Sequence, residues 1–393
     1  MADTITALDL MRTAIGQGTW DPITTMINQN FIMPESIDMV YNQKVSPMLA
    51  SVAMNNRDPE TGSMDRLLHT IPPGGTAITW TATVKNQEAD DVNANGQFTP
   101  KPALEDWSKQ LSLPYAAMIV QIKDSDFINQ VVANQGSTAA MLEYKTKYLK
   151  QHSIGVTEGL ARRFAGNSLQ YYDGNDGTMK NMPTTSLSTP MRWYGLGWGA
   201  STTDNIIMGA TNNYAGLSRT DNPLFAANMF DCTGTNTFGK NLAKVTSIKD
   251  LTLMHILYAH LSTYTGNEYC TDMWCSLEEY MRFQKEAEDR KIINRTDSHL
   301  DKEFGDKYGF DHFRVTRGLR IVLDQKFARP GYLQASNTKY TKPVMVRGWQ
   351  PHLSPRQWQA FGGIGIHYQQ WQCVGQVISE NPHLNLSIFG YEV

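Results

Sequence analysis

The spacing of hydrophobic and polar positions changes several times along this chain. In 76–84, Thr-Ala-Ile-Thr-Trp-Thr-Ala-Thr-Val, β-branched and aromatic residues recur in rough alternation, which predicts a β-strand. A second strand is predicted over 107–122, where apolar side chains such as Leu111 and Leu113 alternate with polar ones. The polar stretch between them, 85–104, would then be the tip of a long projecting hairpin. Loops of this length are usually functional or bound to a partner.

Apolar positions three and four residues apart predict a long helix over 137–165, which ends in the stripe Val156, Leu160 and Phe164. The pair Gly166-Asn167 behind this stripe is a sound signal for a helix end. At ~1.5 Å per residue the helix would span roughly 40 Å, which is long for an ordinary globular domain.

Two shorter helices are predicted in the second half of the chain. Residues 248–263 would form a helix that is apolar on most of its faces. Ser276 and Glu279 stand three residues apart and form a capping box, in which each side chain bonds the other residue's backbone N–H group. This capping box predicts a helix that runs to about Arg290.

Short runs of β-forming residues predict strands at 273–275, 313–315, 320–323, 344–346, 370–378 and 384–389. Helices and strands are mixed without the regular strand–helix–strand order of parallel sheets. The fold class is therefore predicted to be α+β.

The first 67 residues show no sustained helix or strand pattern. They carry a short amphipathic stretch at 5–15, and they are interrupted by four prolines, Pro22, Pro34, Pro47 and Pro59. Such a segment buries little by itself, so we expect an arm that needs another surface for its stability.

Composition and charge narrow the function classes. With 41% hydrophobic and 19% charged residues the chain has a globular balance, and a sizeable core can be buried. A net charge of −3 excludes a strongly basic nucleic-acid-binding protein. It is compatible with a shell protein that encloses DNA without binding it tightly. The four cysteines form no CxxC pair, and no signal peptide or membrane span is recognisable, so we expect a soluble protein made inside the cell.

Two glycine-containing segments are candidates for nucleotide-binding sites. Gly234–Asn241 nearly matches a phosphate-binding loop, but Asn241 stands where Ser or Thr must hold magnesium, and 229–233 is a poor strand. The run Gly195-x-Gly197-x-Gly199 departs from the dinucleotide fingerprint in the place of its third glycine. We interpret the two segments as a polar loop and a flexible loop.

Histidines and cysteines do not show metal-ligand spacing either. His255 and His260 are five apart, so a helix does not place them on one face, and Cys270 and Cys275 miss the spacing of zinc sites. We therefore predict no catalytic, no cofactor-binding and no metal-binding residue.

Four phrases, taken in order, resemble the major capsid proteins of tailed bacteriophages, the Hong Kong 97-like capsid fold family. They are Tyr171–Gly177, then Ile206–Asn213 with Tyr214–Arg219, then Gly318–Asp324, and Asn337–Tyr340. The second is similar to the family's asparagine, Tyr-Gly-Gly-Ile and arginine segment, with Ala215 in place of one glycine. The order of these phrases, more than any one of them, carries the resemblance.

This resemblance implies a division of the chain into an N-terminal arm at 1–67, an extended hairpin loop at 68–118, a peripheral domain with a spine helix at 119–245 and 341–393, and an axial domain at 246–340. It implies a non-enzymatic coat protein that needs no cofactor and assembles as pentamers and hexamers around double-stranded DNA. Implied partners are further copies of the chain, a separate scaffolding protein, a portal and decoration proteins. No membrane is involved. The place implied is the virion capsid, assembled in the host bacterial cytoplasm.

Three alternatives stay open at the level of sequence. An encapsulin-type bacterial nanocompartment shares the fold and packages enzymes instead of a genome. A cytoplasmic enzyme without a recognisable motif would need a polar pocket formed by residues far apart in the sequence. Another virion protein, such as a tail or decoration component, is the third.

Overall fold

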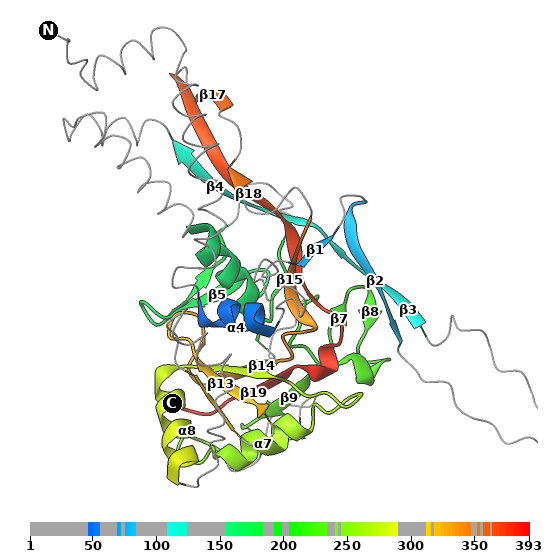
Figure 1. Cartoon of the computed structure of the whole chain (residues 1–393), viewed down its shortest axis with the longest axis vertical. Helices are drawn as coiled ribbons and strands as arrows, with labels where there is room; N and C mark the ends of the chain where they lie inside the picture. The colour runs from blue at the N-terminus through cyan, green and yellow to red at the C-terminus, as the bar shows by residue number, and fades with distance from the viewer. Residues whose placement is uncertain are drawn as a thin grey trace, which may run out of the picture.

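The computed structural model of the chain describes residues 46–55, 69–71, 75–83, 108–123, 155–183, 192–198, 204–233, 240–242, 245–289, 312–315, 318–346, 352–353, 357–361 and 364–393. These residues form two larger β-sheets, three small hairpins and several helices. One large sheet forms the centre of a compact lobe, and the other projects from that lobe as a ribbon (Figure 1).

The lobe is built on a seven-stranded mixed sheet with the order β10-β9-β19-β14-β11-β13-β12. Its strands are β9 (Asn228–Asp231), β10 (Lys240–Asn241), β11 (Asp272–Cys275), β12 (His312–Arg314), β13 (Arg320–Leu323), β14 (Tyr332–Ser336) and β19 (Leu386–Phe389). β11 pairs parallel with β13 and antiparallel with β14. The mixture of parallel and antiparallel pairs agrees with the predicted α+β class.

Both faces of this sheet are covered. Every residue of β9, β11, β13, β14 and β19 is buried. Because successive side chains of a strand point to opposite faces, Met273 and Cys275 enter one hydrophobic cluster and Trp274 enters the other. Helices α7 (Leu253–Leu261) and α8 (Leu277–Asp289) supply the first cluster with apolar residues.

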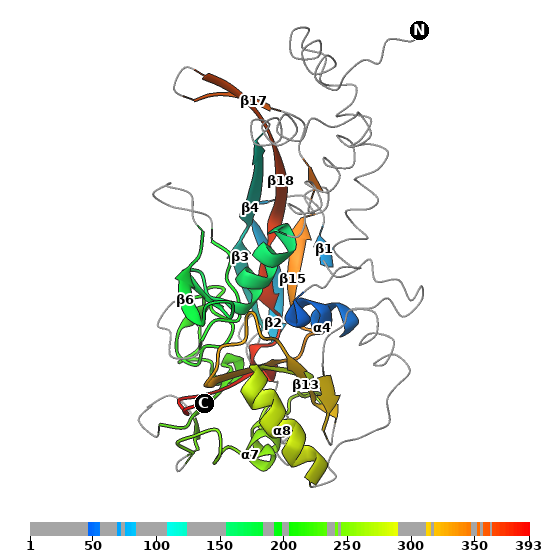
Figure 2. The same ribbon diagram turned by 90° about the vertical axis from the view of Figure 1, so that its left-hand side faces the viewer.

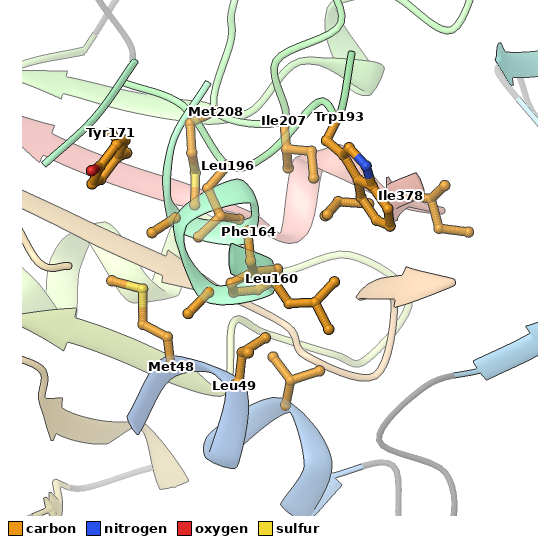
Figure 3. Close-up of a cluster of buried hydrophobic side chains, with 14 of the residues drawn as sticks. Met48, Leu49, Leu160, Phe164, Tyr171, Trp193, Leu196, Ile207, Met208 and Ile378 are labelled. Carbon is orange, nitrogen blue, oxygen red and sulfur yellow. The ribbon is translucent and has the colours of Figure 1, made fainter. Parts of the chain in front are cut away.

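The helix over 155–165 and helix α4 (Pro47–Asn55) supply the second cluster. In Figure 3, Leu160 and Phe164 lie between the α4 side chains Met48 and Leu49 on one side and Leu196 on the other. Phe164 also meets Trp274 of β11 edge to face, with ring centroids 5.7 Å apart.

The ribbon is a six-stranded sheet formed by β1 (His69–Ile71), β4 (Ala116–Lys123), β15 (Thr341–Val346), β16 (His352–Leu353), β17 (Gln357–Phe361) and β18 (Ile364–Ser379). β18 has 16 residues and joins the other strands by pairing with β4, β15, β16 and β17. It extends well beyond the lobe, as Figure 2 shows. We include in the ribbon the hairpin of β2 (Ala77–Thr83) and β3 (Ser108–Pro114).

Smaller elements fill the space between lobe and ribbon. They are the hairpins β5 (Gln170–Asp173) with β6 (Thr178–Asn181) and β7 (Asn213–Tyr214) with β8 (Leu217–Ser218), and the 3-10 turns η3 (Pro223–Phe225) and η5 (Pro382–Leu384). In the described part of the chain, no helix has the length and apolar character needed to cross a membrane.

The predicted hairpin is confirmed at its base, where β2 and β3 pair antiparallel from Ala77↔Pro114 to Thr83↔Ser108. The predicted return strand is broken at Tyr115. Beyond that residue the chain continues as β4, which pairs with β18 instead of β2. The predicted tip, 85–104, lies outside the described residues.

The helix predictions are confirmed in part. The 155–165 helix ends where the Gly166-Asn167 signal predicted, and its predicted start near 137 lies outside the described residues. The helix predicted at 248–263 is shorter, at Leu253–Leu261, because Thr252 caps it. The capping-box helix is α8, which ends at Asp289; Arg290 lies outside the described residues.

All six predicted strands are present. Several further strands were not predicted, and two of them, β9 and β14, lie inside the lobe sheet. The sequence pattern of 229–233 is that of a poor strand, whereas β9 lies there inside the sheet. β14 was not predicted at all. Both carry polar residues that the fold buries, so their hydrophobic pattern was weak.

In its described part, the expected arm does pack on another surface, and that surface belongs to the same chain. Residues Met48, Leu49 and Val52 of α4 are buried against the lobe of the same chain, so this piece of 1–67 finds its surface within the subunit. The predicted domain division stays a prediction. The lobe sheet takes β9, β10 and β19 from outside 246–340, so it crosses both boundaries expected for the axial domain.

Candidate functional site

The part of the molecule most suited to contact other chains is the projecting ribbon. Along β3, Gln110, Ser112 and Pro114 are exposed while Leu111 and Leu113 are buried. The same alternation continues in β4, where Met118 is buried and Ile119 is 49% exposed. An antiparallel sheet with one face covered and one face open shows this pattern. The candidate site is therefore the open face of the ribbon.

Gln376 holds the base of the ribbon. Its side chain is fully buried, and its Nε2 donates to the carbonyls of Pro114 and Arg192, each at 3.0 Å. Its Oε1 accepts from the Tyr194 N–H at 2.7 Å. One amide of β18 thus links the end of β3 to the loop at 192–198, which fixes the direction in which the ribbon leaves the lobe.

The phrase Tyr214–Arg219 anchors the hairpin from the side. Ser112 of β3 donates its N–H to the Ala215 carbonyl at 3.2 Å, and Trp80 meets the Tyr214 ring with centroids 6.3 Å apart. Ala215 stands in the left-handed region at φ 51°, where glycine is favoured. Ala215, which stands where the resembled segment has a glycine, therefore adopts a strained turn conformation.

Arg219 is the cation of the same phrase, and it is almost completely buried. Its Nη2 donates to the Ile207 carbonyl at 3.1 Å, and the guanidinium lies 4.8 Å from the Tyr214 ring centroid. Burial lowers the pKa of Arg219 to about 10 and raises the pKa of the Tyr214 hydroxyl. These groups hold neighbouring loops together and offer no exposed charge for chemistry.

Asp324, the aspartate that ends the third family-like phrase, fixes α4 to the lobe. Its carboxylate is buried and accepts from the Ser46 hydroxyl at 2.7 Å and the Met48 N–H at 3.2 Å, at the start of α4. It also accepts from the N–H groups of Lys326 and Phe327, each at 3.0 Å. Four donors and the positive end of a helix surround one buried charge. Burial nevertheless raises the pKa of Asp324 above its usual value.

Glu279 forms a second buried carboxylate centre beneath α8. It accepts from the N–H and the hydroxyl of Ser276, each at 2.8 Å, and from the Gly331 N–H at 3.0 Å. The Tyr391 hydroxyl also donates to it. The Glu279 side chain, which accepts from the Ser276 N–H as the sequence predicted, therefore also ties the C-terminal end of the chain to the lobe. Burial raises the pKa of this carboxyl.

The two candidate nucleotide-binding segments do not form such sites among the described residues. Lys240 and Asn241 lie in β10, whereas a phosphate-binding loop needs a helix at this position. Residues 234–239 lie outside the described residues. The loop at 195–197 is packed rather than flexible: its Leu196 is fully buried, and its Gly197 carbonyl accepts from Gln334 at 2.5 Å.

The histidines and cysteines have structural surroundings. His255 bonds Thr252 and caps α7, while His260 lies with its Nδ1 3.1 Å from the Cys270 sulfur. Burial raises the pKa of the Cys270 thiol to about 12, so the thiolate needed for nucleophilic chemistry is scarce. Within the described residues no three His, Cys, Asp or Glu side chains are grouped as a metal site would require.

Comparison with known proteins gives structural relatives only. No family model and no curated protein sequence matches the chain. A chain of the capsid asymmetric unit of cyanophage A-1(L) superimposes with a TM-score of 0.55 at 12% identity, over 89% of this chain and 94% of that chain. Mycobacterium phage Ogopogo gives 0.46 at 9% identity over 82% and 90%. A virus-like particle from Pyrococcus furiosus gives 0.35 at 8% identity over 92% and 99%.

Of these three likenesses, the cyanophage one bears on the fold, because its score is the highest and it extends over nearly all of both chains. This chain itself has the order of elements that the sequence suggested: a hairpin, a helix, a mixed sheet and a late long strand. It therefore has the fold of the chain from the cyanophage capsid.

Proposed function

We propose that this chain is the major capsid protein of a tailed phage and assembles as pentamers and hexamers into an icosahedral shell around double-stranded DNA. The observation that carries the proposal is the likeness in fold to a cyanophage capsid chain over nearly the whole of both chains. A fold alone does not fix a function, so the open face of the ribbon is the second support. The chain acts by assembly and not as an enzyme.

The ribbon suits a subunit that is stabilised by its neighbours. Its open face carries polar side chains such as Gln110 and Ser112 beside the apolar Ile119, and we propose that a neighbouring chain covers this face with hydrogen bonds and apolar contacts. Many such contacts, each weak and repeated by symmetry, give a stable shell. A net charge of −3 suits a shell protein that encloses DNA without sequence-specific binding. A scaffolding protein, a portal and decoration proteins are the further partners we propose, with assembly in the host bacterial cytoplasm.

Electron microscopy of the purified chain tests this proposal. The chain is expressed alone and together with a candidate scaffolding protein, and negatively stained particles are recorded. We expect closed, uniform shells tens of nanometres across, as arrays of this size need many copies of one subunit. A monodisperse monomer under both conditions would overturn the proposal. Shells that enclose protein cargo in the native source, and no DNA, would favour the nanocompartment.

A deletion sharpens the role proposed for the hairpin. Removing Lys85–Leu104 leaves β2 and β3 in place, since these strands end at Thr83 and begin at Ser108. We expect a subunit with unchanged circular dichroism that no longer forms shells, because the hairpin would lie over a neighbouring subunit. Normal shells from this deletion would contradict that role.

A further inference from the structure

The β7–β8 hairpin supports the base of the ribbon and contacts three of its strands (Figure 1). The Ser112 N–H of β3 donates to the Ala215 carbonyl at 3.2 Å, and Trp80 of β2 meets the Tyr214 ring. At the end of β18, the Ser379 N–H donates to the Tyr214 hydroxyl at 2.7 Å. Two backbone amides of the ribbon, those of Ser112 and Ser379, therefore have their acceptors in this hairpin.

The hairpin closes through a strained turn. Its two turn residues, Ala215 and Gly216, have φ values of 51° and 85°, as the mirror-image turns of two-residue hairpins require. Glycine adopts this left-handed backbone freely, whereas an alanine there disfavours the closed turn by roughly five- to thirtyfold. Asn205, whose side chain accepts from the Ala215 N–H at 2.8 Å, also has a positive φ of 65°. The hairpin is therefore held closed against the preference of its own backbone.

A buried cation also disfavours the closed hairpin. Arg219 directly follows β8 and is 1% exposed. Its Nη2 donates to the Ile207 carbonyl, whereas its Nε and Nη1 have no hydrogen-bond partner among the described residues. The guanidinium packs directly on backbone, since a methyl group at Gly209 would lie 2.2 Å from Nη1. A buried cation with so few acceptors favours any state in which water reaches it.

We propose that the β7–β8 hairpin is a clip that opens while the lobe stays folded, and that its opening lets the ribbon change direction. Segments that hold strain and buried charge have low local stability. When the clip is open, the ribbon stays attached through the Gln376 side chain and through β18, which η5 joins to β19 of the lobe sheet. The inference concerns the free subunit and does not rest on the proposed function. In an assembly, the open clip would let one ribbon fit neighbours at different angles.

Hydrogen–deuterium exchange of the unassembled subunit tests the clip. The amides of Ser112 and Ser379 report its opening, because both acceptors belong to the hairpin. The Asp324 N–H is the reference, since it donates to the Cys275 carbonyl at 3.1 Å inside the lobe. After correction for intrinsic rates, we expect the two ribbon amides to exchange at least about tenfold faster than the Asp324 amide. Equal rates would mean that the hairpin opens only with the whole subunit, and they would overturn the proposal.

Ala215→Gly tests the strained turn. Glycine removes the backbone strain, so exchange at the Ser112 and Ser379 amides should slow by about fivefold. Asn267→Gly is the matched control, because Asn267 has a φ of 68° in the connection between α7 and β11 of the lobe. This variant should leave both amides unchanged. Unchanged rates in Ala215→Gly, or the same slowing in both variants, contradict the role of the turn.

Arg219→Met tests the buried cation separately. Methionine has a comparable length and no charge, and replacing a buried charge by an apolar side chain is often neutral or stabilising. Exchange at the Ser112 and Ser379 amides should therefore be no faster than in wild type, with an unchanged or higher melting temperature. Faster exchange at both amides would show that the cation holds the clip closed, and it would overturn the part assigned to Arg219. If Arg219→Met does not fold, Ala215→Gly decides alone, because it adds no atom to the core.

Discussion

In the lobe, every residue of β11 and β13 is buried, whereas in the ribbon β3 buries Leu111 and Leu113 and exposes the residues between them. The lobe strands have helices or packed loops on both faces, and one ribbon strand face is open. Both regions are β-sheet with a hydrophobic pattern that is strong enough to predict. They differ in what covers the second face of the sheet. In the lobe, the same chain covers both faces, whereas one face of the ribbon strands is open.

This difference separates stability of the subunit from its capacity to assemble. Side chains in the lobe are surrounded by their own chain, so changes there should be felt in unfolding of the isolated subunit. Outward side chains of the ribbon should matter little for the isolated subunit and more for contacts between subunits. Substitutions chosen in pairs, one in each region, test this separation.

The largest effect is expected at Trp274. Its indole is fully buried, packs against Phe164 and donates to the Ser51 hydroxyl at 2.9 Å. Trp274→Ala should lower the free energy of unfolding by about 3–5 kcal/mol, measured by chemical denaturation of the unassembled subunit. Trp80→Ala in β2 is the matched control, and it should cost clearly less because Trp80 is only partly buried. Equal losses would break the comparison between lobe and ribbon.

A somewhat smaller effect is expected at Asp324. In Asp324→Asn one oxygen acceptor becomes an NH2 donor, and a buried donor such as the Met48 N–H or the Lys326 N–H loses its partner. An unsatisfied buried group costs about 1–3 kcal/mol, so the loss in unfolding free energy should be about 2–3 kcal/mol. Proteolytic cleavage within α4 should become faster. Asp176→Asn, on the exposed turn of the β5–β6 hairpin, should leave cleavage unchanged.

Local signals in the sequence were sufficient for part of this fold. The capping box of Ser276 and Glu279 involves neighbours along the chain, and it placed the start of α8 correctly. The apolar run at 273–275 likewise revealed a strand buried on both faces. In each case the physical cause lies within a few residues of the signal, so no knowledge of the tertiary structure was needed.

The misses have a common physical origin in distant partners. β14 was not predicted because Gln334 and Ser336 appear polar, yet the fold satisfies them with the Gly197 carbonyl and the Asn385 side chain. The burial of α4 depends on Asp324, which is 278 residues from Ser46 in the sequence. Met254, Tyr258 and Leu261 of α7 are exposed, whereas the sequence indicated only a helix that is apolar on most of its faces. Sequence pattern cannot say which apolar face the rest of the chain leaves open.

A pH-dependent effect is expected at Glu279. Burial raises the pKa of its carboxyl above the usual 4.5, although Tyr391, Ser276 and Gly331 donate to it. The native state thus binds the proton more tightly than the unfolded state. The stabilising contribution is complete below pH 4.5 and is lost as pH rises through the native pKa.

Comparison with Glu279→Gln isolates this contribution, because the amide does not titrate. The unfolding free energy of wild type minus that of the variant should fall as the pH is raised from 4.5 toward neutrality. Denaturation curves for both proteins across this range give the difference directly. The raised pKa of Asp324 is present in both proteins and cancels. A difference that grows with pH would show that the hydrogen bonds outweigh burial.

The smallest effect on the subunit is expected at Ile119, whose neighbour Met118 supplies the contrast. Met118 is buried against the helix at Gly159, and Ile119 is 49% exposed on the other face of β4. Ile119→Ala should change the unfolding free energy by less than about 0.5 kcal/mol, whereas Met118→Ala should cost about 2 kcal/mol or more. If the open ribbon face is covered by another subunit, Ile119→Ala should still reduce shell yield in electron microscopy. A large loss of subunit stability at Ile119 would mean that its own chain covers this face, and the contrast between lobe and ribbon would then fail at its clearest point.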